Sequence, residues 1–233
     1  CYHGANDVLL ASKHLKPQGV LDCILNKTLI ARYNDYSDVE FLFRKYGNNI
    51  ACVIVEPIAA NMGLVLPSED FLKGLRELCN SYGSLLIFDE VVTGFRVGLD
   101  GAQGLYRIRP DITILGKIIG GGFPIGAVGG RRDVMSLISP EGNVPNAGTF
   151  NAHPISMAAG LATISMLEER EPYEIANRAA KSIASEIEDE AQRLNMKIQV
   201  TNIASMFHIF FAEKLGEAGL NASEVLEEIG LGN

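Results

Sequence analysis

The most informative pattern in this chain is a series of short apolar runs, each followed at once by polar residues. Such runs lie at residues 50–55, 85–88 and 112–115. A continuous apolar run, rather than an alternating one, is typical of a strand that is buried on both faces of a parallel sheet. The runs therefore predict the central strands of an α/β fold.

Between these runs, apolar residues recur at helical spacing. Residues 37–46 predict a helix with Ser37 as N-cap, and a second helix is expected from Ser68 to about Gly83. The order strand, helix, strand requires parallel pairing through a right-handed crossover. Further along, the pattern predicts a strand at 125–128, helices at 131–138, 154–167 and 174–194, and strands of a smaller domain at 196–200 and 206–211.

Polar side chains follow two of the predicted strands. Asp89 comes directly after the run at 85–88, and Lys117 comes two residues after the run at 112–115. In open α/β sheets ligands bind outside the carboxyl ends of the strands, so we expect the two groups at one rim. Gly116 and residues 120–122, all glycine, let backbone approach a bulky ligand. A partly buried lysine amine there would be available as a nucleophile, whereas Gly116-Lys117 alone would also suit a surface lysine.

Two other classes of protein share parts of this pattern. A hydrophobic run before Asp89 and Glu90 is typical of the magnesium-binding strand of P-loop ATPases. That class requires G-x-x-x-x-G-K-[ST], but Lys117 is followed by Ile118 and no other stretch supplies the loop. A non-catalytic dimerisation or scaffold domain is the third hypothesis, and the presence of both Asp89 and Lys117 argues against it.

Composition narrows the class of protein further. The chain has 233 residues, 47% hydrophobic and 21% charged, which suits one large domain and part of another. Its net charge of -8 argues against nucleic acid as a partner, because such binding needs clustered lysine and arginine. The four cysteines and four histidines lack metal-site spacing, so we expect no metal and a reducing compartment. No apolar run reaches about 18 residues, so no membrane helix is expected.

Several motifs in a fixed order resemble the class III pyridoxal-phosphate aminotransferases, and among them the aminomutases. The motifs are YHG at 2–4, YND at 33–35, EPIAANMG at 56–63, LLIFDEVVTGFR at 85–96, LGKIIGGGFPIGAVGG at 115–130 and AGTFNAHPISMAAG at 147–160. The resemblance implies the fold-type I architecture, a mostly parallel central sheet flanked by helices plus part of a smaller α+β C-terminal domain. It places the large cofactor-binding domain at residues 1–160 and the start of the small domain at 161–233.

The resemblance also implies a cofactor, pyridoxal 5′-phosphate, and the residues that hold it. Lys117 would carry the cofactor as a Schiff base and then act as acid and base, and Asp89 would keep the pyridine nitrogen protonated. Val91 would pack under the ring if the strand continued beyond Asp89. Thr149 would reach the phosphate of the neighbouring subunit, which implies a homodimer with shared sites. The remaining implied cofactor contacts are Tyr2, which would stack on the ring, His3, Glu56, Asn61 and Gly148.

The implied reaction moves nitrogen within a small amino and aldehyde substrate. It converts glutamate-1-semialdehyde to 5-aminolevulinate for tetrapyrrole synthesis in the cytoplasm. An ω-aminotransferase that uses a 2-oxo acid is the alternative, since the same residues serve both. Residues 5–30 depart from the family's glycine- and serine-rich gate and instead carry Lys13, His14, Lys16, Pro17 and Gly19. Because the chain opens inside the YHG motif, we expect a fragment that lacks an N-terminal part and the end of the small domain.

Overall fold

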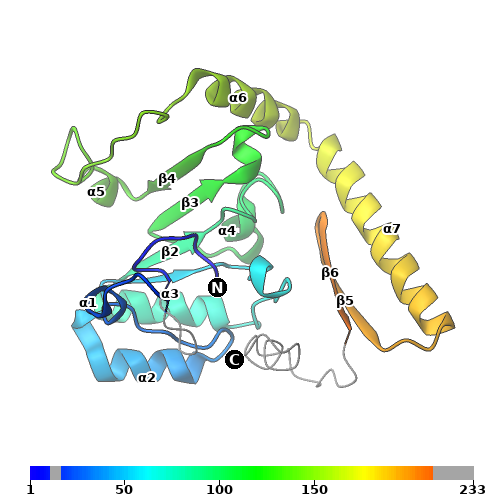
Figure 1. Ribbon diagram of the computed structural model, residues 1–233, viewed down its shortest axis with the longest axis horizontal. Coiled ribbons are helices and arrows are strands. Elements are labelled where there is room, and N and C mark those ends of the chain that lie inside the picture. Colours follow the sequence, from blue (N-terminus) through cyan, green and yellow to red (C-terminus); the bar gives the residue numbers. More distant parts are fainter. Residues whose placement is uncertain (11–16, 212–233) are drawn as a thin grey trace.

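The computed structural model describes residues 1–10 and 17–211 of the chain and has a four-stranded sheet at its centre (Figure 1). Strands β1 (Cys52–Val55), β2 (Leu85–Asp89) and β3 (Ile112–Gly116) run parallel, and β4 (Gly126–Gly130) is antiparallel to β3. The order is β1-β2-β3-β4. The predicted mostly parallel sheet is confirmed. Lys13, His14 and Lys16, in the divergent segment 5–30, lie outside the described residues.

Two helices pack in a layer beneath β1 and β2 (Figure 1). Helix α3 (Phe71–Tyr82) buries one apolar stripe against these strands and ends at Gly83, which adopts the left-handed conformation of a C-cap. Helix α2 (Tyr36–Tyr46) packs on α3 through Val39 and Phe43. The core they form comprises Val39, Phe43, Val55, Phe71, Leu72, Leu75, Leu78, Cys79, Leu86 and Phe88.

Several predicted boundaries were wrong because local hydrogen bonds set the ends of the elements. The N-cap of α2 is Asp35, whose carboxylate accepts the Asp38 N–H, and the Ser37 hydroxyl donates to Asp35 instead of capping. The helix predicted from Ser68 begins at Phe71. The strands predicted at 50–55 and 125–128 lie at Cys52–Val55 and Gly126–Gly130, and the helix predicted at 131–138 is only α5 (Arg132–Met135).

Short elements that the pattern did not predict surround the sheet. They are α1 (Asp22–Leu25), α4 (Gly101–Tyr106) and the 3₁₀ turns η1 (Gly47–Asn49), η2 (Ala60–Met62) and η3 (Lys117–Gly120). Each spans at most six residues, too short for helical periodicity to show in a sequence. Three of them, η2, α4 and η3, follow the carboxyl ends of β1, β2 and β3, the edge where the candidate site lies.

The C-terminal part of the described chain projects from this body as a helix and a hairpin (Figure 1). Helix α6 (Pro154–Glu168) is followed by α7 (Glu171–Arg193) and by the antiparallel strands β5 (Ile198–Ile203) and β6 (Met206–Phe211). The predicted start of α7 at residue 174 was three residues late, because Arg170 takes a left-handed φ of 64° and Pro172 fits the first turn. None of the described helices is long and apolar enough to cross a membrane.

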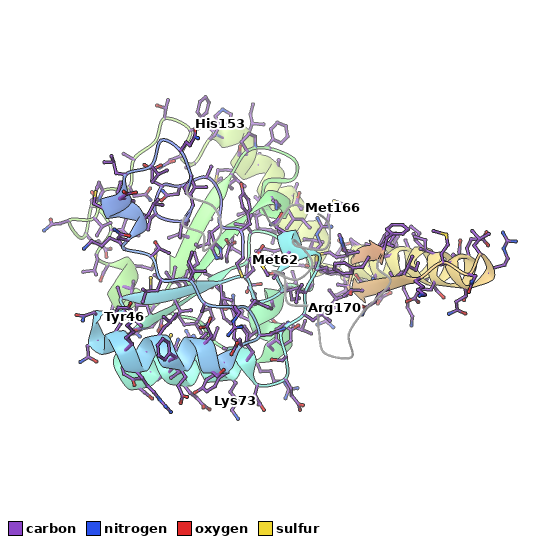
Figure 2. All side chains as sticks on the ribbon, turned by 60° about the horizontal axis from the view of Figure 1, so that its bottom comes forward. Tyr46, Met62, Lys73, His153, Met166 and Arg170 are labelled. Atoms are coloured by element: carbon purple, nitrogen blue, oxygen red, sulfur yellow. The ribbon has the colours of Figure 1, made fainter. Side chains whose placement is uncertain are left out.

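The hairpin and α7 contact the body close to the ends of β1 and β2. The Tyr173 hydroxyl donates to the Phe95 carbonyl oxygen at 2.9 Å. A Cβ added at Gly63 would lie 2.5 Å from the Phe210 ring, so the loop after η2 needs glycine at this approach. Figure 2 shows Met62, Met166 and Arg170 at this junction. Two loops at the edge of the sheet are therefore supported by the C-terminal elements.

Asp111, just before β3, ties α3 and β4 to the sheet. Its carboxylate is 6% exposed and accepts from Arg76 at 2.7 Å, from Arg131 at 2.8 Å and from the Leu86 N–H at 2.7 Å. Burial raises the pKa of Asp111, but these three hydrogen bonds outweigh burial and hold the pKa below its ordinary value. The ionised carboxylate therefore stabilises the fold.

We expect Asp111→Ala to lower the free energy of unfolding by about 3 kcal/mol, since it leaves the largely buried Arg76 without its partner. Because the folded-state pKa lies below the unfolded value of about 4, this stabilisation is present at neutral pH and is lost as pH falls through the folded-state pKa. Urea unfolding of both proteins between pH 7 and pH 3 measures the difference. Asp133→Ala is the matched control, because Asp133 also pairs with Arg131 but is exposed; an equal loss in both variants would contradict the role of Asp111.

Candidate active site

The pairing of β2 with β3 sets the distance between Asp89 and Lys117. Asp89 lies opposite Ile114 in the parallel register, and the Glu90 N–H donates to the Ile114 carbonyl oxygen at 2.9 Å. Lys117 follows Ile114 by three residues and begins η3, one residue beyond the end of β3. Asp89 and Lys117 therefore stand at the carboxyl ends of adjacent strands.

Helix α6 fixes the segment that begins at Lys117. A Cβ at Gly160 of α6 would collide with the Ile119 carbonyl oxygen, so only glycine permits this close approach. The buried Ser156 also donates from its hydroxyl to the Pro124 carbonyl oxygen at 2.9 Å. The small side chains of α6 thus let η3 and the glycine-rich loop pack directly on the helix.

Lys117 itself adopts a left-handed backbone with φ of 47°. For residues other than glycine and asparagine this conformation costs about 1–2 kcal/mol, and such strain gathers at functional positions that the surrounding fold over-determines. The side chain is exposed in the described chain. Activation of the amine by burial, which the sequence argument invoked, therefore has no support from the protein alone.

Asp89 is buried, with 6% of its side chain exposed, and its carboxylate has two partners. Oδ2 lies 2.7 Å from the His3 Nδ1, and Oδ1 accepts the Val91 N–H at 3.0 Å. An ionised carboxylate only accepts hydrogen bonds, so His3 donates when Asp89 is charged. A carboxylate has about four acceptor positions; the two oxygens can still receive a donor from a ligand.

Glu56, the residue after β1, links the start of the chain to η2. Its buried carboxylate accepts the Tyr2 N–H at 3.3 Å through Oε2 and the Asn61 side-chain amide at 3.2 Å through Oε1. Burial raises the pKa of Glu56, and the two hydrogen bonds offset this only in part. Tyr2 and Asn61 are exposed. Glu56 therefore acts as a buried link that presents two exposed residues at the same edge as Asp89.

The comparison with known proteins identifies the family. The family model described as Aminotransferase class-III matches residues 1–229. The chain belongs to the class-III aminotransferase family. It is 54% identical over 218 residues to the glutamate-1-semialdehyde 2,1-aminomutase of Caldivirga maquilingensis, a match that covers 90% of this chain and 51% of the relative. The chain thus spans about half the length of this curated relative.

Solved structures with a similar fold include transaminases. An omega-transaminase from Sphaerobacter thermophilus superposes with a TM-score of 0.86 at 33% identity, over 92% of this chain and 52% of that chain. A transaminase with PLP (pyridoxal 5′-phosphate) bound superposes with a TM-score of 0.84 at 30% identity, over 96% and 54%. The fold-type I architecture predicted from the motifs is therefore confirmed.

The sequence placed Val91 under the ring if strand β2 continued beyond Asp89, but the strand does not continue that far. Strand β2 ends at Asp89, and the chain turns at once, with the Gly94 N–H donating to the Glu90 carbonyl oxygen at 2.8 Å. The side chain of Val91 nevertheless reaches the next strand end, because a Cβ added at Gly116 would lie 3.4 Å from its Cγ1. The turn, rather than the pleat, brings Val91 next to Lys117.

Gly148 and Thr149 lie on a different segment from the other predicted contacts. They occupy the exposed loop between α5 and α6 (Figure 1), where the Asn151 N–H donates to the Gly148 carbonyl oxygen at 3.0 Å. Of the predicted residues, His3 and Val91 each bind the Asp89 carboxylate, and Tyr2 and Asn61 each bind the Glu56 carboxylate. A phosphate contact from Thr149 stays a prediction.

The YND motif supports the loop that carries Asn61, a role that the sequence did not reveal. The Tyr33 hydroxyl donates to the Pro57 carbonyl oxygen at 3.1 Å, next to Glu56. The Asn34 side chain donates to the Leu66 carbonyl oxygen at 2.9 Å and accepts the Ser68 N–H at 2.9 Å. These bonds span 24 to 34 positions of sequence, so only the fold brings the motif to the loop.

Proposed function

We propose that this class-III aminotransferase chain forms the cofactor-binding part of a pyridoxal-phosphate-dependent aminomutase that acts on glutamate-1-semialdehyde. The observation that carries the proposal is the placement of Asp89 and Lys117 at the ends of adjacent parallel strands. Support for the substrate comes from the 54% identity to an aminomutase over 90% of this chain. The cofactor agrees with the PLP-bound transaminase of the same fold.

The residues at the strand ends suit this cofactor. When bound, pyridoxal phosphate supplies an aldehyde that takes up an amino group and a pyridinium ring that accepts electrons. Lys117 is the amine at hand for the aldehyde, and Asp89 has acceptor capacity left for the ring N–H. Val91 at Gly116 offers an apolar surface between them, and the exposed ring of Tyr2 stands at the same edge.

Each residue then has a distinct task. Asp89, oriented by the His3 ring and the Val91 N–H, holds a proton on the pyridine nitrogen, because an opposite charge within a few ångströms favours the charged form. With the cofactor bound, the Lys117 amine would act as the acid and base that moves the proton at the reacting carbon. Since the amine is exposed in the protein alone, its desolvation must come from the bound ring and substrate. Asn61, held by Glu56, would contribute a polar contact to the bound cofactor.

We expect the full-length protein to convert glutamate-1-semialdehyde to 5-aminolevulinate with no 2-oxo acid present. An aminomutase returns nitrogen to the same carbon skeleton, so no second substrate is consumed. Colorimetric detection of 5-aminolevulinate, with and without an added 2-oxo acid, measures this. Equal rates in both mixtures support the proposal, whereas a reaction that requires the 2-oxo acid would favour an ω-aminotransferase.

The apolar surface of the α6 region supports a homodimer with shared active sites. Large apolar side chains on α6 and on the loop before it are exposed: Phe150 is 78%, Leu161 69%, Met166 63% and Ile155 55% exposed. Large exposed apolar side chains suit a protein interface, and the loop also carries Thr149. A second copy seated there would bring Thr149 towards the partner's cofactor.

Two further assignments complete the proposal. The four cysteines are free thiols, which suits a reducing compartment, and we place the enzyme in the cytoplasm. The division into a large domain at 1–160 and a small domain at 161–233 stays a prediction. Helix α6 runs through the predicted boundary at residues 160 and 161. The first break after it is at Arg170, between α6 and α7.

A further inference from the structure

Glu90, the neighbour of Asp89, is a fully buried acid with no part in the proposed chemistry. Its relative exposure is 0%. Oε2 accepts the Thr93 hydroxyl at 3.0 Å and the Ala102 N–H at 2.5 Å. Oε1 accepts the Gln103 N–H at 3.2 Å and the Gln103 side-chain amide at 3.0 Å. All four donors belong to the segment 93–103, so the carboxylate closes this segment into a loop.

The loop is shaped around that carboxylate. Gly101 has a φ of 60°, and a Cβ there would collide with Oε2 of Glu90. Only glycine at position 101 leaves room for the Glu90 carboxylate, so the close contact between them depends on this residue. Thr93 and Ala102, which supply two of the donors, are 1% and 0% exposed. Water therefore has little access to these hydrogen bonds, and the loss of one leaves a buried donor without an acceptor.

The closed loop also sets the direction of Asp89. The backbone N–H of Glu90 is bound to Ile114 of β3, and its side chain is bound to the start of α4. With the backbone and the side chain of Glu90 both bound, the backbone of its neighbours Asp89 and Val91 is held in place at the end of β2. The Val91 N–H then meets Oδ1 of Asp89 at 3.0 Å. Rotation of Glu90 would move both partners of that bond.

We propose that Glu90 is a positioning residue that holds the Asp89 carboxylate and Val91 in the orientation needed by the cofactor ring. The inference rests on the proposed function, since it assigns Asp89 to the ring nitrogen. A positioning role differs from a purely structural one in its effect on the cofactor. If Glu90 were displaced, both the affinity for the cofactor and the absorbance of the bound cofactor would change.

The decisive variant is Glu90→Gln, tested in the full-length protein. The amide has one acceptor oxygen and one NH₂ group, so at least one buried N–H of Ala102 or Gln103 loses its acceptor. In cofactor-free protein we expect hydrogen exchange at these two amides to be about tenfold faster. With pyridoxal phosphate we expect about tenfold weaker binding and a shifted absorbance maximum. Glu77→Gln, an exposed glutamate on α3, leaves all three quantities unchanged.

Thr93→Val is the second variant, for use if Glu90→Gln does not fold. It removes the hydroxyl that donates to Glu90 and preserves the shape of the side chain. It should change exchange and absorbance in the same direction, by a smaller factor. Faster exchange with unaltered cofactor affinity and absorbance in either variant overturns the positioning role, and so does unaltered exchange. Failure of the proposed function gives a different result, since the wild-type protein would then bind no pyridoxal phosphate or form no 5-aminolevulinate.

Discussion

Lys117→Ala in the full-length protein is expected to abolish the yellow absorbance of covalently attached pyridoxal phosphate and to reduce turnover by about 10⁴-fold or more. The variant removes both the nucleophile that holds the cofactor and the group that moves the substrate proton, and a positioned acid or base alone contributes about 10²–10⁴-fold. Absorbance spectra, borohydride reduction followed by mass measurement, and 5-aminolevulinate formation test the expectation.

Two comparisons separate chemistry from folding. Lys73→Ala removes an exposed lysine from α3 on the outer surface of the body (Figure 2) and should alter neither absorbance nor turnover. Lys117→Gly removes the same amine but also relieves the left-handed strain at φ of 47°, so the cofactor-free variant should be more stable than Lys117→Ala by about 1 kcal/mol. Borohydride-reducible cofactor retained in Lys117→Ala would contradict the assignment of Lys117.

The fold was predictable where burial decides the pattern. The run at 85–88 forms the parallel strand β2, Leu85–Asp89, which is buried on one face and half-buried on the other. Helix α3 follows the apolar stripe that the sequence predicts and ends at Gly83. Its start was misplaced because Ser68, an apparent N-cap, accepts the Phe71 N–H through its backbone carbonyl instead. Capping residues indicate that a helix begins nearby, but the hydrogen bonds decide where.

The candidate site was predictable only as far as strand ends and motifs reach. Asp89 ends β2 and Lys117 follows β3, so their common edge could be read from the two apolar runs in the chain. The contact between His3 and Asp89 joins residues 86 positions apart and has no local signal. Glu90 would be taken for an exposed acid from its residue type, since glutamate is rarely buried unless it is paired. Its four donors come from a loop whose closure depends on the left-handed Gly101.

Asp89→Asn is expected to retain bound cofactor while it lowers turnover by about 10²–10⁴-fold. The amide matches the carboxylate in shape, and its oxygen can still accept the Val91 N–H. It carries no charge, however, so it no longer favours a protonated pyridine nitrogen, and the ring becomes a poorer electron acceptor. Turnover at saturating substrate, together with the pH dependence of the absorbance of the bound cofactor, measures the effect.

The size of this loss distinguishes charge from structure. In Asp89→Asn the nitrogen of the substituted amide would face the His3 ring, which can then accept through its other protonation form, so we expect a melting temperature close to that of the wild type. Asp133→Asn, an exposed aspartate paired with Arg131, controls for loss of one negative charge. An undiminished rate in Asp89→Asn would make Asp89 a structural residue of β2. A slow variant with normal stability and an altered cofactor spectrum would instead place its charge at the ring nitrogen, because no packing change accounts for that combination.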